Sequence, residues 1–269
     1  MTLVELLIGL AIGLLVVAVA MGAMMVSRGI SGTVSDASEL QQQAAYALRV
    51  IGLQVRQAGA LYLNPNPMGA APENARAAAV AFETTAPAAS PALGFNPATD
   101  TLGGADSSLS VGYRRYKELV YGSAGEQALS RNCLGGPADT NVDQRVENNF
   151  TLVGSELRCG GNDTAAAPQA IIQNVADFQV RYLLQDNSAP GDPKLRYVSA
   201  ATVGADWGKV QAVQVCLVLY GNEAIDMPAG SSYLGCDGTT AVDMTTLTGA
   251  RAKRMHIAFR SVFQLRSQG

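Results

Sequence analysis

The first 26 residues contain an apolar run that dominates what this chain can fold into. No charge occurs in the 21 consecutive residues from Leu6 to Val26, which read LLIGLAIGLLVVAVAMGAMMV. At about 1.5 Å rise per residue, a helix of this length measures roughly 30 Å, the thickness of a bilayer's hydrocarbon core. Core helices of soluble proteins are usually shorter, and a secretory signal peptide has a basic region before its apolar region. We therefore predict that residues 1–27 form a membrane-spanning helix that stays with the chain.

The orientation of this helix depends on the charges that flank it. No Lys or Arg precedes Arg28, whereas a membrane anchor needs positive charge on its cytoplasmic side. We expect that a short basic leader is removed just before Met1. The N-terminus would then lie at the cytoplasmic face of the membrane and the bulk of the chain across it.

Glu5 interrupts the apolar N-terminus. A carboxylate costs about 2.5–3.5 kcal/mol at the bilayer centre and less near the interface. It could extend to the interface, it could become neutral by protonation, or it could pair with a cation such as the free α-amino group of residue 1 on a neighbouring copy or related subunit. Gly9 and Gly13 are spaced so that two membrane helices could approach closely at that face.

The helical pattern continues beyond the membrane, so the helix is expected to cover residues 1–62. Apolar or small residues recur at helical spacing at Ile30, Val34, Ala37, Ala44, Leu48, Ile51, Val55 and Ala58. The opposite positions carry Asp36, Glu39, Gln42, Arg49 and Arg56. This pattern predicts an amphipathic helix that lies on a folded domain and ends near Leu61, shortly before Pro65 and Pro67.

The rest of the chain divides into an irregular segment and a β-rich domain. Residues 63–106 are rich in Ala and Pro and show little periodicity, which predicts a long loop. From residue 107 to residue 269 apolar residues alternate with polar ones, which predicts strands in SSLSVGY, NNFTLV, DFQVRYLL, LRYVS, residues 209–220 and a last strand from Met255. The predicted class is α+β, with the amphipathic helix packed on a largely antiparallel sheet.

Four cysteines, all beyond the apolar run, suit two disulfides in an oxidising compartment. Of the three possible pairings we favour Cys133–Cys159 and Cys216–Cys236, because each closes a local loop between or beside predicted strands. A four-thiolate zinc site is the alternative, but no close Cys-x-x-Cys pair supports it.

The composition argues against catalysis, cofactors and nucleic acid. His256 is the only histidine, and its alternating pattern predicts a strand position. Asp163, Asp186, Asn187 and Asp192 could offer oxygens to calcium, but they lack an EF-hand pattern, so solvated turns are the favoured interpretation. The net charge is −3, so the clusters Arg114, Arg115, Lys117 and Arg251, Lys253, Arg254 are interpreted as solvated or as edge-strand protection rather than a nucleic-acid site. We predict no enzyme, no metal and no cofactor.

The N-terminal sequence MTLVELLIGLAIGLL resembles that of mature type IV pilins and type II secretion pseudopilins. This resemblance implies that a prepilin peptidase cuts a leader, that the amine of Met1 is methylated, and that Glu5 pairs with a neighbouring subunit's N-terminus during assembly. Most family members begin with Phe, so Met1 departs from the pattern. A Pro near position 22 is common in major pilins, and here Gly22 occupies that position.

Blocks along the rest of the chain are similar to PilW-type minor pilins. They are DSSLSVGY, Cys133-Leu134-Gly135, NNFTLVGSELRC, IIQNVADFQVRYLLQDN, the Trp207-containing approach to VQAVQVCLVLY, and RMHIAFRSVFQLR. The resemblance implies a subunit that is stored in the inner membrane with its domain in the periplasm and is later part of an extracellular type IV pilus. Its implied partners are other major and minor pilins and the assembly machinery. A pseudopilin of the type II secretion system is the alternative.

Overall fold

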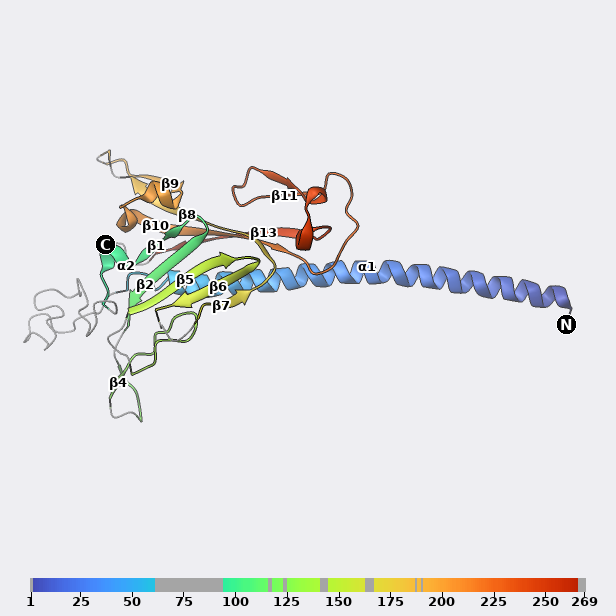
Figure 1. Cartoon of the computed structure of the whole chain (residues 1–269), viewed down its shortest axis with the longest axis horizontal. Coiled ribbons are helices and arrows are strands. Elements are labelled where there is room, and N and C mark those ends of the chain that lie inside the picture. Colours follow the sequence, from blue (N-terminus) through green and yellow to red (C-terminus); the bar gives the residue numbers. More distant parts are fainter. Residues whose placement is uncertain are drawn as a thin grey trace, which may run out of the picture.

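The computed structural model describes residues 2–60, 94–115, 118–122, 125–140, 145–162, 167–186, 188–189 and 191–265. A long N-terminal helix runs out of one end of a β-rich globular domain (Figure 1). This arrangement confirms the predicted α+β class, a long helix packed on antiparallel sheet.

The helix α1 spans Leu3–Val55 without a break. Its residues Leu3–Met25 form a span that is long and apolar enough to cross a membrane, and none of it is buried in the chain's own fold. The other half buries one stripe against the domain, at Leu40, Ala44, Ala47, Ile51 and Val55, which is the 3–4 residue spacing of one helix face.

The end and the polar face of α1 differ from the prediction. The helix ends at Val55 rather than near Leu61, because the chain turns there and pairs with a strand: Gly59 donates to the carbonyl of Gly112, and Arg114 donates to that of Ala60. Val34, expected on the buried stripe, is 64% exposed, and Asp36, expected on the opposite face, is only 5% exposed.

The domain contains two antiparallel main sheets rather than the single sheet expected. The first has the order β1-β2-β5-β6-β7 and comprises Leu102–Ala105, Ser108–Arg114, Arg145–Val153, Glu156–Gly161 and Gln169–Ile172. The second has the order β13-β10-β8-β9 and comprises His256–Gln264, Val210–Tyr220, Val175–Asp186 and Lys194–Val198. β1 and the short helix α2 (Pro97–Asp100) lie inside the segment expected to be irregular, most of which (63–93) is outside the described residues.

Smaller elements complete the domain. β3 (Glu118–Leu119) pairs with β4 (Glu126–Gln127), and β11 (Ser232–Leu234) pairs with β12 (Ala241–Asp243). Among the described residues, further short helical segments connect strands: α3 (Ala200–Val203), η2 (Trp207–Lys209), η3 (Met244–Thr246) and η4 (Gly249–Arg251).

The core lies where α1 meets the inner faces of both sheets. Strand β10 contributes Val213, Val215, Leu217 and Leu219, all fully buried, which is the alternation that its sequence predicts. Its other face is also buried near Cys216 and Val218, because the excursion between β10 and β13 covers it. The domain therefore packs against about half of α1, and the other half is exposed on all sides. We call this exposed half the bare half of α1.

Candidate functional site: the N-terminal helix and its attachments to the domain

Glu5 forms a capping box with Thr2 at the start of α1. The Thr2 N–H donates to Glu5 Oε2 over 2.8 Å, and the Glu5 N–H donates to Thr2 Oγ1 over 3.4 Å. A carboxylate is favourable here because helix N-termini carry partial positive charge. Both residues are exposed, and a carboxylate can accept several hydrogen bonds, so this geometry still allows Glu5 to receive a donor from outside. Met1 lies outside the described residues.

Gly9 and Gly13 present open backbone on the bare half of the helix. Apart from the helix's own nearby backbone, no atom of the described residues lies within 4 Å of a Cβ built at either position. Residues four apart share one helix face, so the two glycines form a shallow strip among the exposed apolar side chains. The bare half of α1 therefore requires lipid or other helices around it.

Asp36 attaches the middle of α1 to the loop that follows β10. Its Oδ1 accepts the N–H of Asn222 over 2.9 Å, and its Oδ2 accepts the N–H of Glu223 over 3.0 Å. Arg254 donates to the carbonyls of Gly221 and Asn222 from the other side. A Cβ on Gly221 would lie 2.0 Å from Asp36 Oδ2. A glycine is therefore required at position 221 for this close approach.

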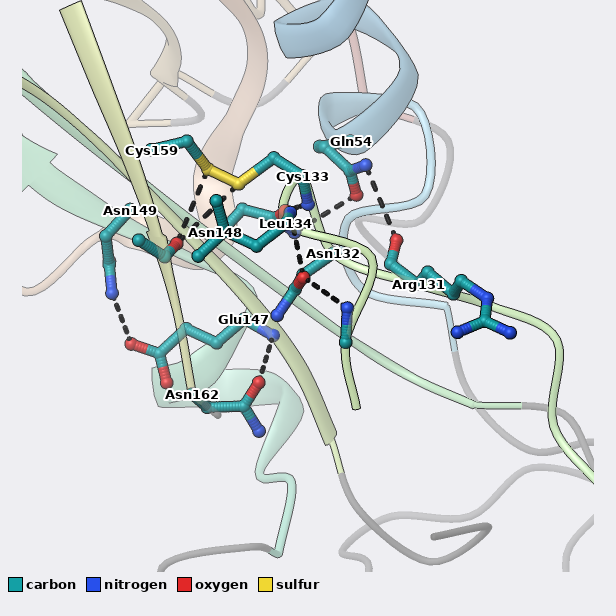
Figure 2. The surroundings of a disulfide bond; sticks show 12 residues. Gln54, Arg131, Asn132, Cys133, Leu134, Glu147, Asn148, Asn149, Cys159 and Asn162 are labelled. Carbon is teal, nitrogen blue, oxygen red and sulfur yellow. Dashed lines mark hydrogen bonds between the residues drawn. A yellow bond between two sulfur atoms is a disulfide. The ribbon is translucent and has the colours of Figure 1, made fainter. Parts of the chain in front are cut away.

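Gln54 attaches the end of α1 to the first sheet through a buried polar network. The Tyr113 hydroxyl lies 2.7 Å from Gln54 Oε1 and 2.9 Å from the carbonyl of Arg131, and Asn148 Nδ2 donates to Gln54 Oε1 over 3.1 Å. Figure 2 shows Gln54 directed toward this cluster from the helix. Burial raises the pKa of the Tyr113 phenol well above its usual value, so the hydroxyl stays neutral and available as a hydrogen-bond partner.

The disulfide Cys133–Cys159 lies next to this network (Figure 2). Cys133 belongs to the loop before β5 and Cys159 to β6, and the N–H of Cys133 donates to Asn148 Oδ1 over 2.8 Å. Asn132 shapes the same loop, since its Oδ1 accepts the N–H groups of Leu134 and Gly136. The bridge and the network together hold this loop against the first sheet.

The second disulfide, Cys216–Cys236, ties the excursion between β10 and β13 to the second sheet. His256 supports the same attachment: its ring stacks on Tyr233 with centroids 5.1 Å apart, and Arg251 Nε lies 3.3 Å from its Nε2. Burial, with the nearby Arg251 charge, lowers the pKa of His256. His256 thus has the strand position expected for it, as a packing residue.

The arginines of the first basic cluster are buried, contrary to the interpretation of that cluster as solvated, whereas in the second cluster Lys253 is exposed and Arg251 and Arg254 are partly exposed. Arg114 and Arg115 are only 2% and 1% exposed, and Arg115 donates to the carbonyls of Ala128, Ser130 and Ala138. In the second cluster Arg251 and Arg254 are also engaged, as described above. Arg115 and Arg254 bind loop carbonyls, and Arg251 binds the Tyr233 hydroxyl and the His256 ring. A buried guanidinium is costly unless its N–H groups find acceptors. Lys117 lies outside the described residues.

Within the described part of the chain, no group of three or more His, Cys, Asp or Glu side chains could hold a metal ion. Asp163 and Asn187 lie outside that part. Asp186, which is described, accepts the N–H of Ser188 in a tight turn. The four cysteines are paired in the two disulfides.

Sequence reasoning missed the roles of Asp36 and Gln54, two polar helix residues that hydrogen-bond to the domain. Both are polar side chains in an amphipathic pattern, and polar residues are assigned by default to the solvent side. The only available signal was positional: Gln54 is adjacent to the apolar stripe residue Val55, and Asp36 is adjacent to Ala37.

Comparison with known proteins relates the C-terminal region to one family. Residues 141–267 match the family model described as type IV pilus-assembly protein W, which confirms the resemblance to that family in this region. Among solved structures, a type IV-like pilin from Thermus thermophilus aligns with 84% of this chain and 97% of its own, at 14% identity and a TM-score of 0.37. Among curated proteins, none is similar enough in sequence to match the chain.

Proposed function

We propose that this chain is a minor pilin that is incorporated in a type IV pilus, or that primes or caps its assembly. The observation that carries the proposal is the match of residues 141–267 to a type IV pilus-assembly family in a chain whose first helix leaves an apolar span bare. The expected partners are other major and minor pilins, which would cover that span. The same helix would hold the subunit in the inner membrane before assembly, with the domain in the periplasm.

Assembly then depends on replacing lipid around α1 with the helices of other subunits. The apolar side chains of Leu3–Met25 remain buried in both surroundings, so the transfer between them costs little hydrophobic free energy. Gly9 and Gly13 would let neighbouring helices approach closely. The assembly machinery would extract the subunit, after a prepilin peptidase has exposed the amine of Met1.

Glu5 would set the axial position of the subunit in the fibre. Outside the aqueous phase a carboxylate needs a partner, and the α-amino group of a neighbouring subunit supplies a positive one. The capping contact with the Thr2 N–H holds the carboxylate at the helix end, where a neighbouring amine can reach it. A subunit that is out of register would leave this charge unpaired in an apolar environment.

Quantitative mass spectrometry of sheared surface filaments and of washed membranes tests this proposal. A processed and methylated Met1 peptide in filaments, at a small fraction of the major pilin, is the expected result. Detection in membranes alone would contradict it and would favour a pseudopilin of a type II secretion system.

The role of Glu5 is tested by Glu5→Ala and Glu5→Lys in the same assay, with Asp192→Asn as a charge-matched control. Asp192 is exposed on the globular domain, so its replacement should leave the filament content unchanged. Both Glu5 variants should stay in the membrane with native disulfides and be depleted from filaments. Normal incorporation of both variants would refute the pairing.

A further inference from the structure

The loop between β10 and β11, residues 221–231, has a fixed position relative to the apolar span. Figure 1 shows that this loop runs beside α1 and reaches further toward the N-terminus than the rest of the globular domain. Asp36 holds it on the helix side through the N–H groups of Asn222 and Glu223, and Arg254 holds it on the domain side. The loop therefore cannot move along the helix independently.

The distance from the loop to the end of the span is set by the helix. An open hollow of about 360 Å³ is lined by Gly29, Gly32 and Thr33 on α1 and by residues 223–226 of the loop. At about 1.5 Å rise per residue, Gly29 lies roughly 6 Å beyond Met25, and Gly32 roughly 10 Å. Each headgroup layer of a bilayer is about 5–8 Å deep. With Leu3–Met25 across the hydrocarbon core, the loop thus begins at the level of the headgroups.

The chemistry of the loop fits that level. Ala224, Pro228 and Ala229 are exposed small or apolar residues, and Ile225 and Met227 are half-buried. Glu223 lays its stem over the helix, since its Cγ lies 3.7 Å from a Cβ built at Gly32. The exposed residue Lys253 lies alongside, because its carbonyl accepts the N–H of Ile225. Small apolar residues between charges of both signs suit a layer where apolar and charged groups mix.

We propose that loop 221–231 rests on the lipid headgroups of the leaflet from which the globular domain emerges. The chain in the membrane is then held by the span and also by this loop, so the domain has a defined face toward the bilayer. The inference rests on the proposed function only in that α1 spans a membrane. It does not require that the chain enters a pilus.

Spin-label accessibility in nanodiscs of phosphatidylcholine tests this contact with the full chain. The four native cysteines are paired, so Ala229→Cys places a single label on the loop. Thr99→Cys labels an exposed residue of helix α2 at the opposite end of the domain, and Leu15→Cys labels the middle of the span. Relaxation by a water-soluble nickel chelate should be several-fold weaker at position 229 than at position 99, and weakest at position 15.

A spacer variant separates lipid contact from shielding by the protein itself. Seven residues inserted between Arg28 and Gly29 would lift the domain by about 10 Å and keep nearly the same helix face toward it. The label at position 229 should then become as accessible as that at position 99, while both disulfides still form. Equal accessibility of positions 229 and 99 without the spacer, or no change with it, would overturn the proposal. A water-accessible label at position 15 would instead refute the membrane span itself.

Discussion

The N–H group of Asn222 donates to Oδ1 of Asp36 over 2.9 Å, although the two residues are 186 positions apart. The other oxygen of the same carboxylate accepts the next N–H along the chain, that of Glu223. One helix side chain thus satisfies two consecutive backbone donors of a loop that is distant in the sequence. This contact determines where along α1 the globular domain begins.

Replacing Asp36 with Ala should destabilise the domain by about 1–3 kcal/mol, because two part-buried N–H groups would lose their acceptor. Urea unfolding of the detergent-solubilised chain measures the change. Glu39→Ala is the matched control, since Glu39 is an exposed carboxylate on the same helix. It accepts a hydrogen bond from the side-chain amide of Asn222 and not from its backbone N–H. Equal losses in the two variants would show that the backbone contacts of Asp36 contribute nothing special.

Gly52→Ala should also destabilise, although Ala is the better helix former by about 1 kcal/mol. A Cβ at position 52 would lie 2.5 Å from Cε1 of Phe263 on β13, so the ring or the helix would have to shift. Overpacking of this kind costs about 1–3 kcal/mol. Gly29→Ala provides the comparison, because nothing lies within 4 Å of its Cβ position. In thermal unfolding, the melting temperature of the wild type should be higher than that of Gly52→Ala and should not exceed that of Gly29→Ala. The reverse order would refute this packing argument.

Loss of either disulfide should lower the free energy of unfolding by about 3 kcal/mol in the chain-entropy description. The bridges join residues 26 and 20 positions apart, and neither lies in the apolar span. The double variant Cys216→Ala/Cys236→Ala should therefore expose the amides of the excursion between β10 and β13 to faster hydrogen exchange, while membrane flotation stays unchanged. Loss of flotation, or unchanged exchange in that segment, would contradict the view that the disulfide stabilises the domain while the apolar span alone holds the chain in the membrane.

The stability of the domain should fall as the pH falls below about 6.5, the ordinary pKa of histidine. Burial lowers the pKa of His256 in the folded state, so the unfolded chain binds the proton more readily. The stabilising contribution is complete above the unfolded pKa and is lost as the pH falls through the lowered one. Protonation would also set two donors, His256 Nε2 and Arg251 Nε, against each other across 3.3 Å.

Urea unfolding between pH 8 and pH 5 measures this dependence, with His256→Gln as the reference. A Gln amide offers one donor and one acceptor and does not titrate, so its profile should be flatter. Burial raises the pKa of Asp177, so this residue makes the folded domain more stable as the pH falls through a more acidic range. This effect is common to both proteins. Identical slopes for the two proteins near pH 6 would refute the role of His256.

Features that depend on a local pattern could be predicted from the sequence. The apolar span and strand β10 each have a run of side chains whose period fixes the element and its buried face. Strands β6 and β7 were not predicted, because their sequences ELRCGG and QAII show no clear alternation of apolar and polar residues. Their pairing depends on neighbouring strand edges: β6 pairs with β5, and β7 pairs in turn with β6.

The attachments of α1 could not be predicted, because they depend on residues that only the folded chain brings together. Asp36 is buried since a loop almost 190 residues away offers it two N–H groups. Arg115 is buried because carbonyls from the loop that contains Ala128 and Ala138 surround its guanidinium. In each case the partners that satisfy the buried polar side chain come from another part of the sequence, so its sequence neighbours do not indicate that it is buried.

The unbroken course of α1 from the apolar span into the core has a mechanical consequence. A pull on the N-terminal half is transmitted along one stiff rod, and the load reaches the domain as shear between the helix and the sheets. Asp36 meets that load first, followed further along by the close contact of Gly52 with Phe263 and then by Gln54. The chain should therefore move as a single rigid body under axial force, and it should yield at the boundary between α1 and the sheets before the strands of either sheet separate.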